Sequence, residues 1–231
     1  MFQSRGGTFQ EMSPVSDFNV SKGSVQVTLS SGSKHHARNL VLSAGAWSGE
    51  LLERLDLQLP LKPEAVTVPF WAVKQPSIYD INKFPCLQDV TNQYWGIPPM
   101  EYHGLFKLVD PKTNEVMTNP NIRDAVSTPR DQLMGIYRPY ITEHFPNLSF
   151  PAAIIERCLY TVTPDGLWIV DRHPVQNNVV VLAGFSGHGF KAGPIIGKLV
   201  SEMVTGSSKI ERYDMSSLSI DRFVKKSFSH L

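Results

Sequence analysis

The stretch Val179-Val180-Val181-Leu182-Ala183-Gly184-Phe185-Ser186-Gly187-His188-Gly189-Phe190-Lys191 decides the fold class. Its opening apolar run, Val179–Gly184, predicts a buried strand. A glycine-rich loop follows, and a helical pattern then runs from about Lys191 to Thr205, with Gly206 placed to cap its end. The expected apolar face of this helix carries Ile195, Ile196, Leu199, Val200 and Met203.

This order of strand, glycine loop and helix favours a ligand-binding turn. A helix N-terminus exposes unpaired N–H groups and a partial positive charge, and glycines let a flat or anionic ligand approach the backbone. Gly187–Ala192 also fits the loose dinucleotide pattern G-x-G-x-x-G/A. That pattern should open a βαβ unit, but no second clear strand follows it here. A tight turn that needs glycine for steric reasons alone therefore stays open as the alternative.

Two other kinds of site fit the sequence poorly. Gly184–His188 resembles the nucleophile elbow G-x-S-x-G of serine hydrolases, but a histidine stands where the closing glycine is needed. The histidines also lack tight ligand spacing with Cys86 and Cys158, so a metal site is disfavoured. From pattern alone, Cys158 is a buried strand cysteine, the commonest fate of a lone cysteine.

The first third of the chain predicts an antiparallel meander followed by a buried strand. Phe18–Val20 and Val25–Leu29 are short β-rich runs with turn residues between and after them. Asn39–Trp47 reads as a strand that ends in small residues. A short helix should follow from about Ser48 to Leu55, with Leu51, Leu52 and Leu55 on its apolar face.

The middle of the chain, from about Val66 to Phe150, is rich in proline and aromatic residues and predicts a β-rich layer with long connections. Within it, Asp131–Phe145 reads as a helix that Pro146 ends. The stripe of this helix would hold Leu133, Ile136, Tyr137 and Ile141. Two further strands are expected at Ile154–Tyr160 and Leu167–Val170.

Composition excludes several classes of protein. With 42% apolar and 19% charged residues, the 231-residue chain can bury a core and need not be disordered. Its net charge of +1 comes from mixed acidic and basic residues, and this charge pattern does not favour nucleic-acid binding. The two cysteines cannot build a disulfide framework. No apolar run approaches the roughly 20 residues that a membrane-spanning helix needs.

The C-terminus resembles a targeting signal. Ser229-His230-Leu231 is a small/basic/leucine variant of the tripeptide Ser-Lys-Leu, which a peroxisomal import receptor reads. Lys225 and Lys226 add positive charge just before it. An ordinary frayed tail is the alternative.

Three linked motifs carry a family resemblance. They are Arg157–Asp165, Ile169–Pro174 and Ala183–Lys191, in this order. Together they resemble the C-terminal signature of the monomeric sarcosine oxidase and peroxisomal sarcosine (L-pipecolate) oxidase family of FAD-dependent enzymes. Leu42–Trp47 and Gly104–Lys107 look like two further segments of the same family.

The resemblance implies an α+β fold of two parts. An incomplete FAD-binding domain of the glutathione-reductase type would comprise residues 1–65 and 158–224. A β-sheet substrate domain would comprise residues 66–157, and residues 225–231 would form the peroxisomal targeting tail. No G-x-G-x-x-G strand turn occurs before residue 45, so the segment that binds the ADP half of FAD is expected to be absent from this sequence.

The resemblance also implies roles for particular residues. Cys158 matches the cysteine that carries FAD through a thioether. Pattern alone makes Lys107 and Lys191 solvated lysines, whereas in the family Lys107 would assist O₂ reduction and Lys191 would hold the substrate carboxylate. Tyr160 would line the substrate pocket. The expected flavin contacts are Ala44, Gly45, Gly184, Ser186, Gly187, His188, Gly189 and Phe190. No metal, nucleic acid or membrane is implied, and the protein would be a monomer.

Two departures leave the substrate open. Trp95 stands where the family has a tyrosine, and Pro111 stands where it has a pocket histidine. The leading hypothesis is a peroxisomal oxidase of secondary or cyclic amino acids that reduces O₂ to H₂O₂. The alternative is a truncated, catalytically inactive paralogue that serves as a structural or interaction module.

Overall fold

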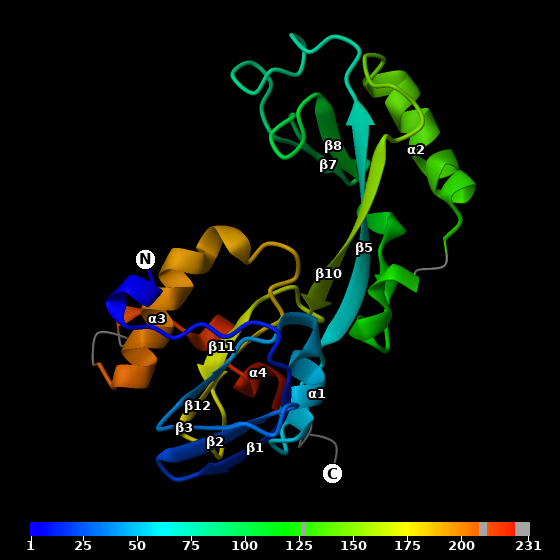
Figure 1. Ribbon diagram of the computed structural model, residues 1–231. Coiled ribbons are helices and arrows are strands. Elements are labelled where there is room, and N and C mark those ends of the chain that lie inside the picture. Colours follow the sequence, from blue (N-terminus) through cyan, green and yellow to red (C-terminus); the bar gives the residue numbers. More distant parts are fainter. Residues whose placement is uncertain (126–127, 208–211, 225–231) are drawn as a thin grey trace. The chain divides into compact units, whose positions relative to one another are not determined.

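The computed structural model describes residues 1–125, 128–207 and 212–224, and the chain forms two units (Figure 1). The first unit combines the N-terminal part up to Leu61 with the part that starts at Val162. The second unit is the inserted segment Lys62–Thr161. Both units mix helices and strands, as the sequence predicts. The expected tail, residues 225–231, lies outside the described residues.

The first unit begins with the predicted antiparallel meander. Its strands pair in the order β1-β2-β3, and Phe18 of β1 lies opposite Val27 of β2. A glycine at position 23, with φ of +74°, makes the tight turn between the first two strands. The strands are β1 (Val15–Ser21), β2 (Ser24–Leu29) and β3 (Lys34–Ala37).

The second sheet of this unit contains the strand predicted at residues 179–184 and part of the one predicted at 39–47, of which residues 45–47 form a 3-10 turn instead. Its order is β11-β12-β4, in which β12 runs parallel to β4 and antiparallel to β11. Residues Leu167 and Trp168, expected to be in a strand, precede it instead, and Leu167 is exposed. The strands are β4 (Leu40–Leu42), β11 (Ile169–Arg172) and β12 (Val179–Ala183).

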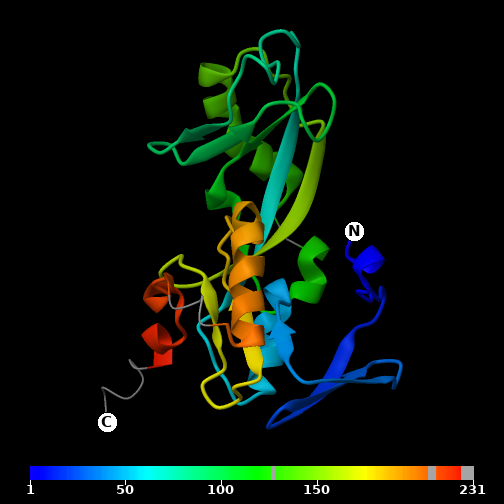
Figure 2. The same ribbon diagram turned by 90° about the vertical axis from the view of Figure 1, so that its left-hand side faces the viewer.

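Helices cover both faces of this sheet because successive side chains of a strand point to opposite faces. Val179 and Val181 of β12 pack with Leu52 of α1, while Val180 packs with Ile196 of α3. The helix α3 lies beside β12 in both views (Figures 1 and 2). The helices of this unit are α1 (Ser48–Glu53), α3 (Gly193–Thr205) and α4 (Asp221–Val224).

The predicted helix after the glycine loop is confirmed with one correction. A single 3-10 turn, Phe190–Ala192, precedes α3, and Gly206 ends the helix with φ of +70°. Ile196, Leu199 and Met203 are buried as expected. Ile195 was expected on the same face but is 42% exposed, because it lies at the solvent edge of this stripe.

The second unit is built on a sheet of six strands. The order is β10-β5-β8-β7-β6, and β9 pairs with β5. The long strand β5 lies between β10 and β8, so side chains from three strands share each face at its centre. The strands are β5 (Lys62–Ala72), β6 (Leu87–Asp89), β7 (Tyr94–Ile97), β8 (Leu105–Val109), β9 (Glu115–Val116) and β10 (Ile154–Val162).

One face of this sheet is covered by α2 (Arg130–His144). Leu133, Tyr137 and Ile141 pack onto Trp71 and its neighbours, as the expected stripe requires. Ile136 was expected in this stripe but is 40% exposed, since it is turned by about 100° from Tyr137 around the helix axis. Met134 is buried in its place. The opposite face carries a separate apolar cluster, described below.

Short 3-10 turns complete the structure. No helix among the described ranges is both long enough and apolar enough to span a membrane. The 3-10 turns are η1 (Gln3–Arg5), η2 (Gly45–Trp47), η3 (Pro111–Thr113), η4 (Pro120–Ala125), η5 (Phe190–Ala192) and η7 (Ser216–Leu218).

Candidate functional site

Two turns of small residues meet at one edge of the β11-β12-β4 sheet. Because β4 and β12 are parallel, with Leu42 opposite Val181, their carboxyl ends lie at the same edge. The turn after β4 contains Ala44 and Gly45, and the turn after β12 begins at Gly184. Ligands of open α/β sheets bind outside this edge of the strands. The structure thus brings together two segments that the sequence separates by well over a hundred residues.

The turn after β12 needs glycine at its first position. Gly184 has φ of +66°, and a β-carbon there would lie 2.3 Å from the Cγ2 methyl of Thr163. Ser186 and Gly187 also have positive φ, of 50° and 82°. Ser186 accepts this conformation while its hydroxyl donates to the carbonyl of Gly184 at 2.9 Å. Steric fit therefore requires glycine at position 184, which is itself buried, whereas Gly187 and His188 after it are exposed.

An aromatic pair fixes the histidine of this turn. The indole N–H of Trp168 donates to Nδ1 of His188 at 2.7 Å, and the two rings lie 5.5 Å apart. Because Nδ1 accepts, the proton of a neutral His188 resides on Nε2. The ring is thereby held as a donor that points away from Trp168.

The start of the helix carries the remaining predicted residues of this edge. Gly189 packs so tightly on the ring of Phe185 that a β-carbon there would lie 2.4 Å from it. Phe190 and Lys191 follow in η5, and both side chains are exposed. The first turn of α3 contains no acidic residue, so no carboxylate of that turn offsets the positive end of the helix dipole.

The second unit gathers a different group on the sheet face opposite α2. Lys107 of β8 lies directly opposite Phe70 of β5 and Ile97 of β7. Its ammonium group is 5.2 Å from the ring centre of Phe70 and 5.9 Å from that of Trp95. The side chain is only 15% exposed, so Lys107 is not the freely solvated lysine that pattern alone suggests. Aromatic faces attract such a cation.

Glu101 neutralises part of this charge. Its carboxylate forms an ion pair with Lys107 from the loop between β7 and β8. The next residue, Tyr102, donates to the carboxylate of Glu156 and packs edge-on against Phe70 with ring centres 4.9 Å apart. No sequence pattern predicts these roles for Glu101 and Tyr102, and Tyr102 reaches Glu156 across 54 positions of the chain.

Cys158 lies on the same strand as Glu156 and Tyr160, and alternation along β10 points all three side chains to one face. The thiol is exposed, which corrects the expectation of a buried strand cysteine. Its surroundings still desolvate it. This desolvation and the charge of Glu156 raise the pKa of the Cys158 thiol, while Lys107 and Arg123 act in the opposite direction.

Tyr160 lies deeper in the same face. It packs against the apolar cluster of Val66, Val68, Phe70 and Val109. Burial raises the pKa of its phenol, and the charge of Cys158 adds to this effect. Tyr160 is therefore a neutral hydroxyl at physiological pH, which can donate and accept hydrogen bonds.

The predicted residues thus fall into two groups. Lys107, Cys158 and Tyr160 share one sheet face of the second unit, whereas the turn residues and Lys191 line the sheet edge of the first unit. Among the described residues, no three histidine, cysteine or acidic side chains form a possible metal site. The buried His173 bonds the carbonyl of Leu55 through Nε2 at 2.9 Å.

Comparison with known proteins identifies the family of the chain. The family model described as FAD dependent oxidoreductase matches residues 1–203. The chain belongs to this family. Peroxisomal sarcosine oxidase of Mus musculus is 37% identical, and the match covers 90% of this chain and 53% of that protein. Monomeric sarcosine oxidase of Bacillus sp. (strain NS-129) is 31% identical, with 95% and 56% covered.

Two solved structures of oxidases share the fold. Glycine oxidase from Geobacillus kaustophilus superimposes with a TM-score of 0.76 at 18% identity, covering 95% of this chain and 55% of that one. A fructosyl peptide oxidase mutant gives a TM-score of 0.72 at 22% identity, covering 94% and 54%. The fold class expected from the sequence is confirmed. The chain spans about half the length of the curated relatives it matches.

The charges around Cys158 lead to a test of its thiol. We expect Glu156→Gln to lower the pKa of Cys158, because the substitution removes the negative charge that opposes thiolate formation. The thiolate is the reactive form, so alkylation by iodoacetamide at a fixed pH below the midpoint should be faster in this variant. Mass spectrometry of the Cys158 peptide across a pH series measures the midpoint.

Lys107→Met should move the same midpoint upward, since it removes a cation that favours the thiolate. Glu143→Gln, an exposed substitution on α2, is the matched control and should leave the profile unchanged. An unchanged or raised midpoint in Glu156→Gln would exclude an action of Glu156 on this thiol.

Proposed function

We propose that this chain forms part of a flavin-dependent oxidase of secondary or cyclic amino acids. Bound FAD would accept a hydride from the C–H next to the substrate nitrogen and pass the electrons to O₂, giving H₂O₂ and an imine that water hydrolyses. The observation that carries this proposal is the parallel pairing of β12 with β4, which brings two turns of small residues and the start of α3 to one sheet edge.

The residues of this edge suit a flavin. Ala44 and Gly45 are small, Gly45 is exposed, and the glycine loop 186–190 leads into the positive end of α3. Such a helix end would stabilise negative charge on the ring system of a bound flavin. We therefore assign cofactor contacts to these residues and to Ser186, Gly187, His188, Gly189 and Phe190.

The sheet face of the second unit carries the other group of predicted residues. We propose that Lys107 supplies positive charge for O₂ reduction, and that Tyr160 donates a hydrogen bond within the substrate pocket. Lys191 would hold the carboxylate of the substrate from the start of α3. Trp95 lies within the same face and contacts the ammonium of Lys107, so its aromatic ring would take part in substrate choice.

A covalent link to flavin is the sharpest test of the assignment. The longest natural polypeptide that contains residues 1–231 should retain yellow flavin after acid precipitation. The Cys158 thiolate would add to the 8α-methyl carbon as that carbon loses a proton, and the electron pair taken up by the flavin would pass to O₂, giving H₂O₂. Cys158→Ser should release all flavin on precipitation. Cys86→Ser is the matched control, since Cys86 is also free and exposed, and it should retain the flavin.

Absorbance of the washed precipitate at the flavin bands measures the outcome. Equal retention in Cys158→Ser and Cys86→Ser would exclude the covalent link. A polypeptide that binds no FAD at all would contradict the proposed function itself.

The two lysines should affect different half-reactions. Lys107→Met should slow reoxidation of the reduced flavin by O₂ by roughly 10²–10³-fold, since it removes one pre-placed charge from a partly desolvated site. Reduction by substrate should change much less. Lys191→Ala should slow reduction instead, because it weakens the hold on the substrate carboxylate.

Stopped-flow absorbance separates the two half-reactions. Lys83→Met, an exposed lysine of the second unit, is the control and should match the parent in both. Parental reoxidation in Lys107→Met would show that this lysine has only a packing role.

The location of the protein is proposed from its relatives and its tail. Two peroxisomal sarcosine oxidases are 34% and 37% identical to the chain, and an enzyme that makes H₂O₂ suits that compartment. We expect a fluorescent fusion with a free Ser229-His230-Leu231 end to enter peroxisomes through the import receptor. Removal of the last three residues should leave it in the cytosol. A fusion that stays cytosolic with this end exposed would contradict the proposal.

A further inference from the structure

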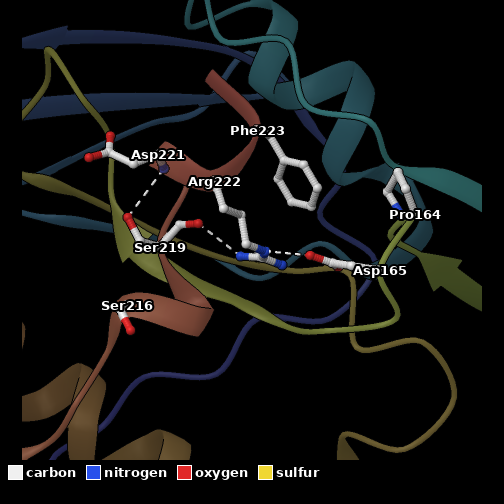
Figure 3. A pocket seen from close by; sticks show the side chains of 7 residues that line it. All are labelled: Pro164, Asp165, Ser216, Ser219, Asp221, Arg222 and Phe223. Carbon is white, nitrogen blue, oxygen red and sulfur yellow. Dashed lines mark hydrogen bonds and ion pairs between the residues drawn. The ribbon is translucent and has the colours of Figure 1, made fainter. Parts of the chain in front are cut away.

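A segment near the C-terminus is hydrogen-bonded to the turn that precedes β11. This segment runs from η7 to α4 and lines a surface hollow of about 870 Å³ together with Pro164 and Asp165 (Figure 3). Its own anchor is Asp171 of β11, whose carboxylate accepts from the hydroxyl of Ser219 and the N–H of Ile220 at 2.7 and 2.8 Å. The segment is therefore fixed to the sheet before it reaches the turn.

Arg222 makes the hydrogen bonds between this segment and the turn. Its Nε donates to the carboxylate of Asp165 at 2.8 Å, and its Nη2 donates to the carbonyl of Leu167, also at 2.8 Å. The remaining Nη1 donates to the carbonyl of Ser219 at 2.8 Å, so one guanidinium joins the turn to the anchored segment. The side chain of Arg222 is 15% exposed, and its plane lies 4.3 Å from the ring centre of Phe223.

The turn that Arg222 binds also contacts the glycine loop. The carbonyl of Leu167 also accepts from the hydroxyl of Thr163 at 2.8 Å. The N–H of Thr163 donates to the hydroxyl oxygen of Ser186 at 3.4 Å, and that hydroxyl donates to the carbonyl of Gly184. Each N–H or O–H group in this series donates to one acceptor, so a continuous series of hydrogen bonds connects Arg222 to the loop.

Close packing reinforces the hydrogen bonds. Thr163 is buried, and its methyl group occupies the space where a side chain at position 184 would lie. A shift of the turn would therefore move Thr163 against the backbone of Gly184. Two observations, the bond series and the steric contact, connect the same pair of segments.

We propose that Arg222 is a positioning residue for the glycine loop 184–189. It acts through Leu167 and Thr163 and touches no reacting atom. Its guanidinium binds the carbonyl of Leu167, which also accepts from the hydroxyl of Thr163. The N–H of Thr163 donates to Ser186 and so keeps the loop in the conformation that would bind the flavin. The inference rests on the proposed function only for what the loop binds, since the mechanical link lies wholly within the first unit.

Hydrogen exchange of the purified 231-residue chain tests the link without any cofactor. Arg222→Gln removes the ion pair and the bond to Leu167, and we expect roughly tenfold faster exchange in peptides covering residues 184–190. Peptides of the β1-β2-β3 meander and of the second unit should exchange as in the parent. Should Arg222→Gln fail to fold, Arg222→Lys, which keeps the charge but not the three-way fork, is the substitute variant.

Matched variants separate positioning from general destabilisation. Arg54→Gln also removes an arginine ion pair in the first unit, with Glu50, and should leave residues 184–190 unchanged. Thr163→Val should loosen the loop as Arg222→Gln does, because it keeps the methyl packing on Gly184 and removes only the hydroxyl that donates to Leu167. The double variant Arg222→Gln/Thr163→Val should exchange no faster than either single variant.

Faster exchange confined to residues 212–224, or additive effects of the two substitutions, would overturn the proposal. A second readout is FAD affinity of the longest natural polypeptide, which should fall by about tenfold in both Arg222→Gln and Thr163→Val. Parental affinity despite a loosened loop would overturn the link to flavin. If the parent binds no FAD, the proposed function fails, and the exchange result still decides the role of Arg222.

Discussion

The parallel pairing of β12 with β4 is the constraint on which the rest of the structure depends. It joins strands from opposite ends of the chain, and it aligns the turn at Gly45 with the turn at Gly184. The alternating residues of β12 then supply both helices with apolar surface, α1 through Val179 and Val181 and α3 through Val180. Because this pairing joins residues before Leu61 to residues after Val162, the segment Lys62–Thr161 is an insertion between two parts of one unit.

The sequence predicts much of this arrangement because its signals are local. The apolar run 179–183, the glycine loop and the helix ending at Gly206 follow from strand length, backbone freedom and helical periodicity. Ile136 and Ile195 were assigned wrongly to buried stripes. Periodicity identifies an apolar sector, but the width of the sector that a neighbour covers depends on how the sheet curves beneath the helix.

The candidate site was predictable only where residues follow one another in the chain. Lys107 and Cys158 emerged through family resemblance, and alternation along the predicted strand 154–160 places Glu156 beside Cys158. Nothing in the sequence marked Glu101 or Tyr102 as their neighbours. Arg222 is connected to the glycine loop only indirectly, through Leu167, which lies 55 residues before it in the chain, and Thr163. Contacts of this kind depend on strand register and on loops that fold back, neither of which a pattern of hydrophobicity encodes.

The contact between Thr163 and Gly184 makes these two positions one steric unit. With only 2.3 Å between the threonine methyl and the place of a β-carbon, a larger residue at 184 can be accommodated only if 163 becomes smaller. Even then the left-handed backbone of Gly184 disfavours any branched side chain. The two sites should consequently covary among homologues as a coupled pair. Attempts to redesign the sheet edge must exchange both residues together.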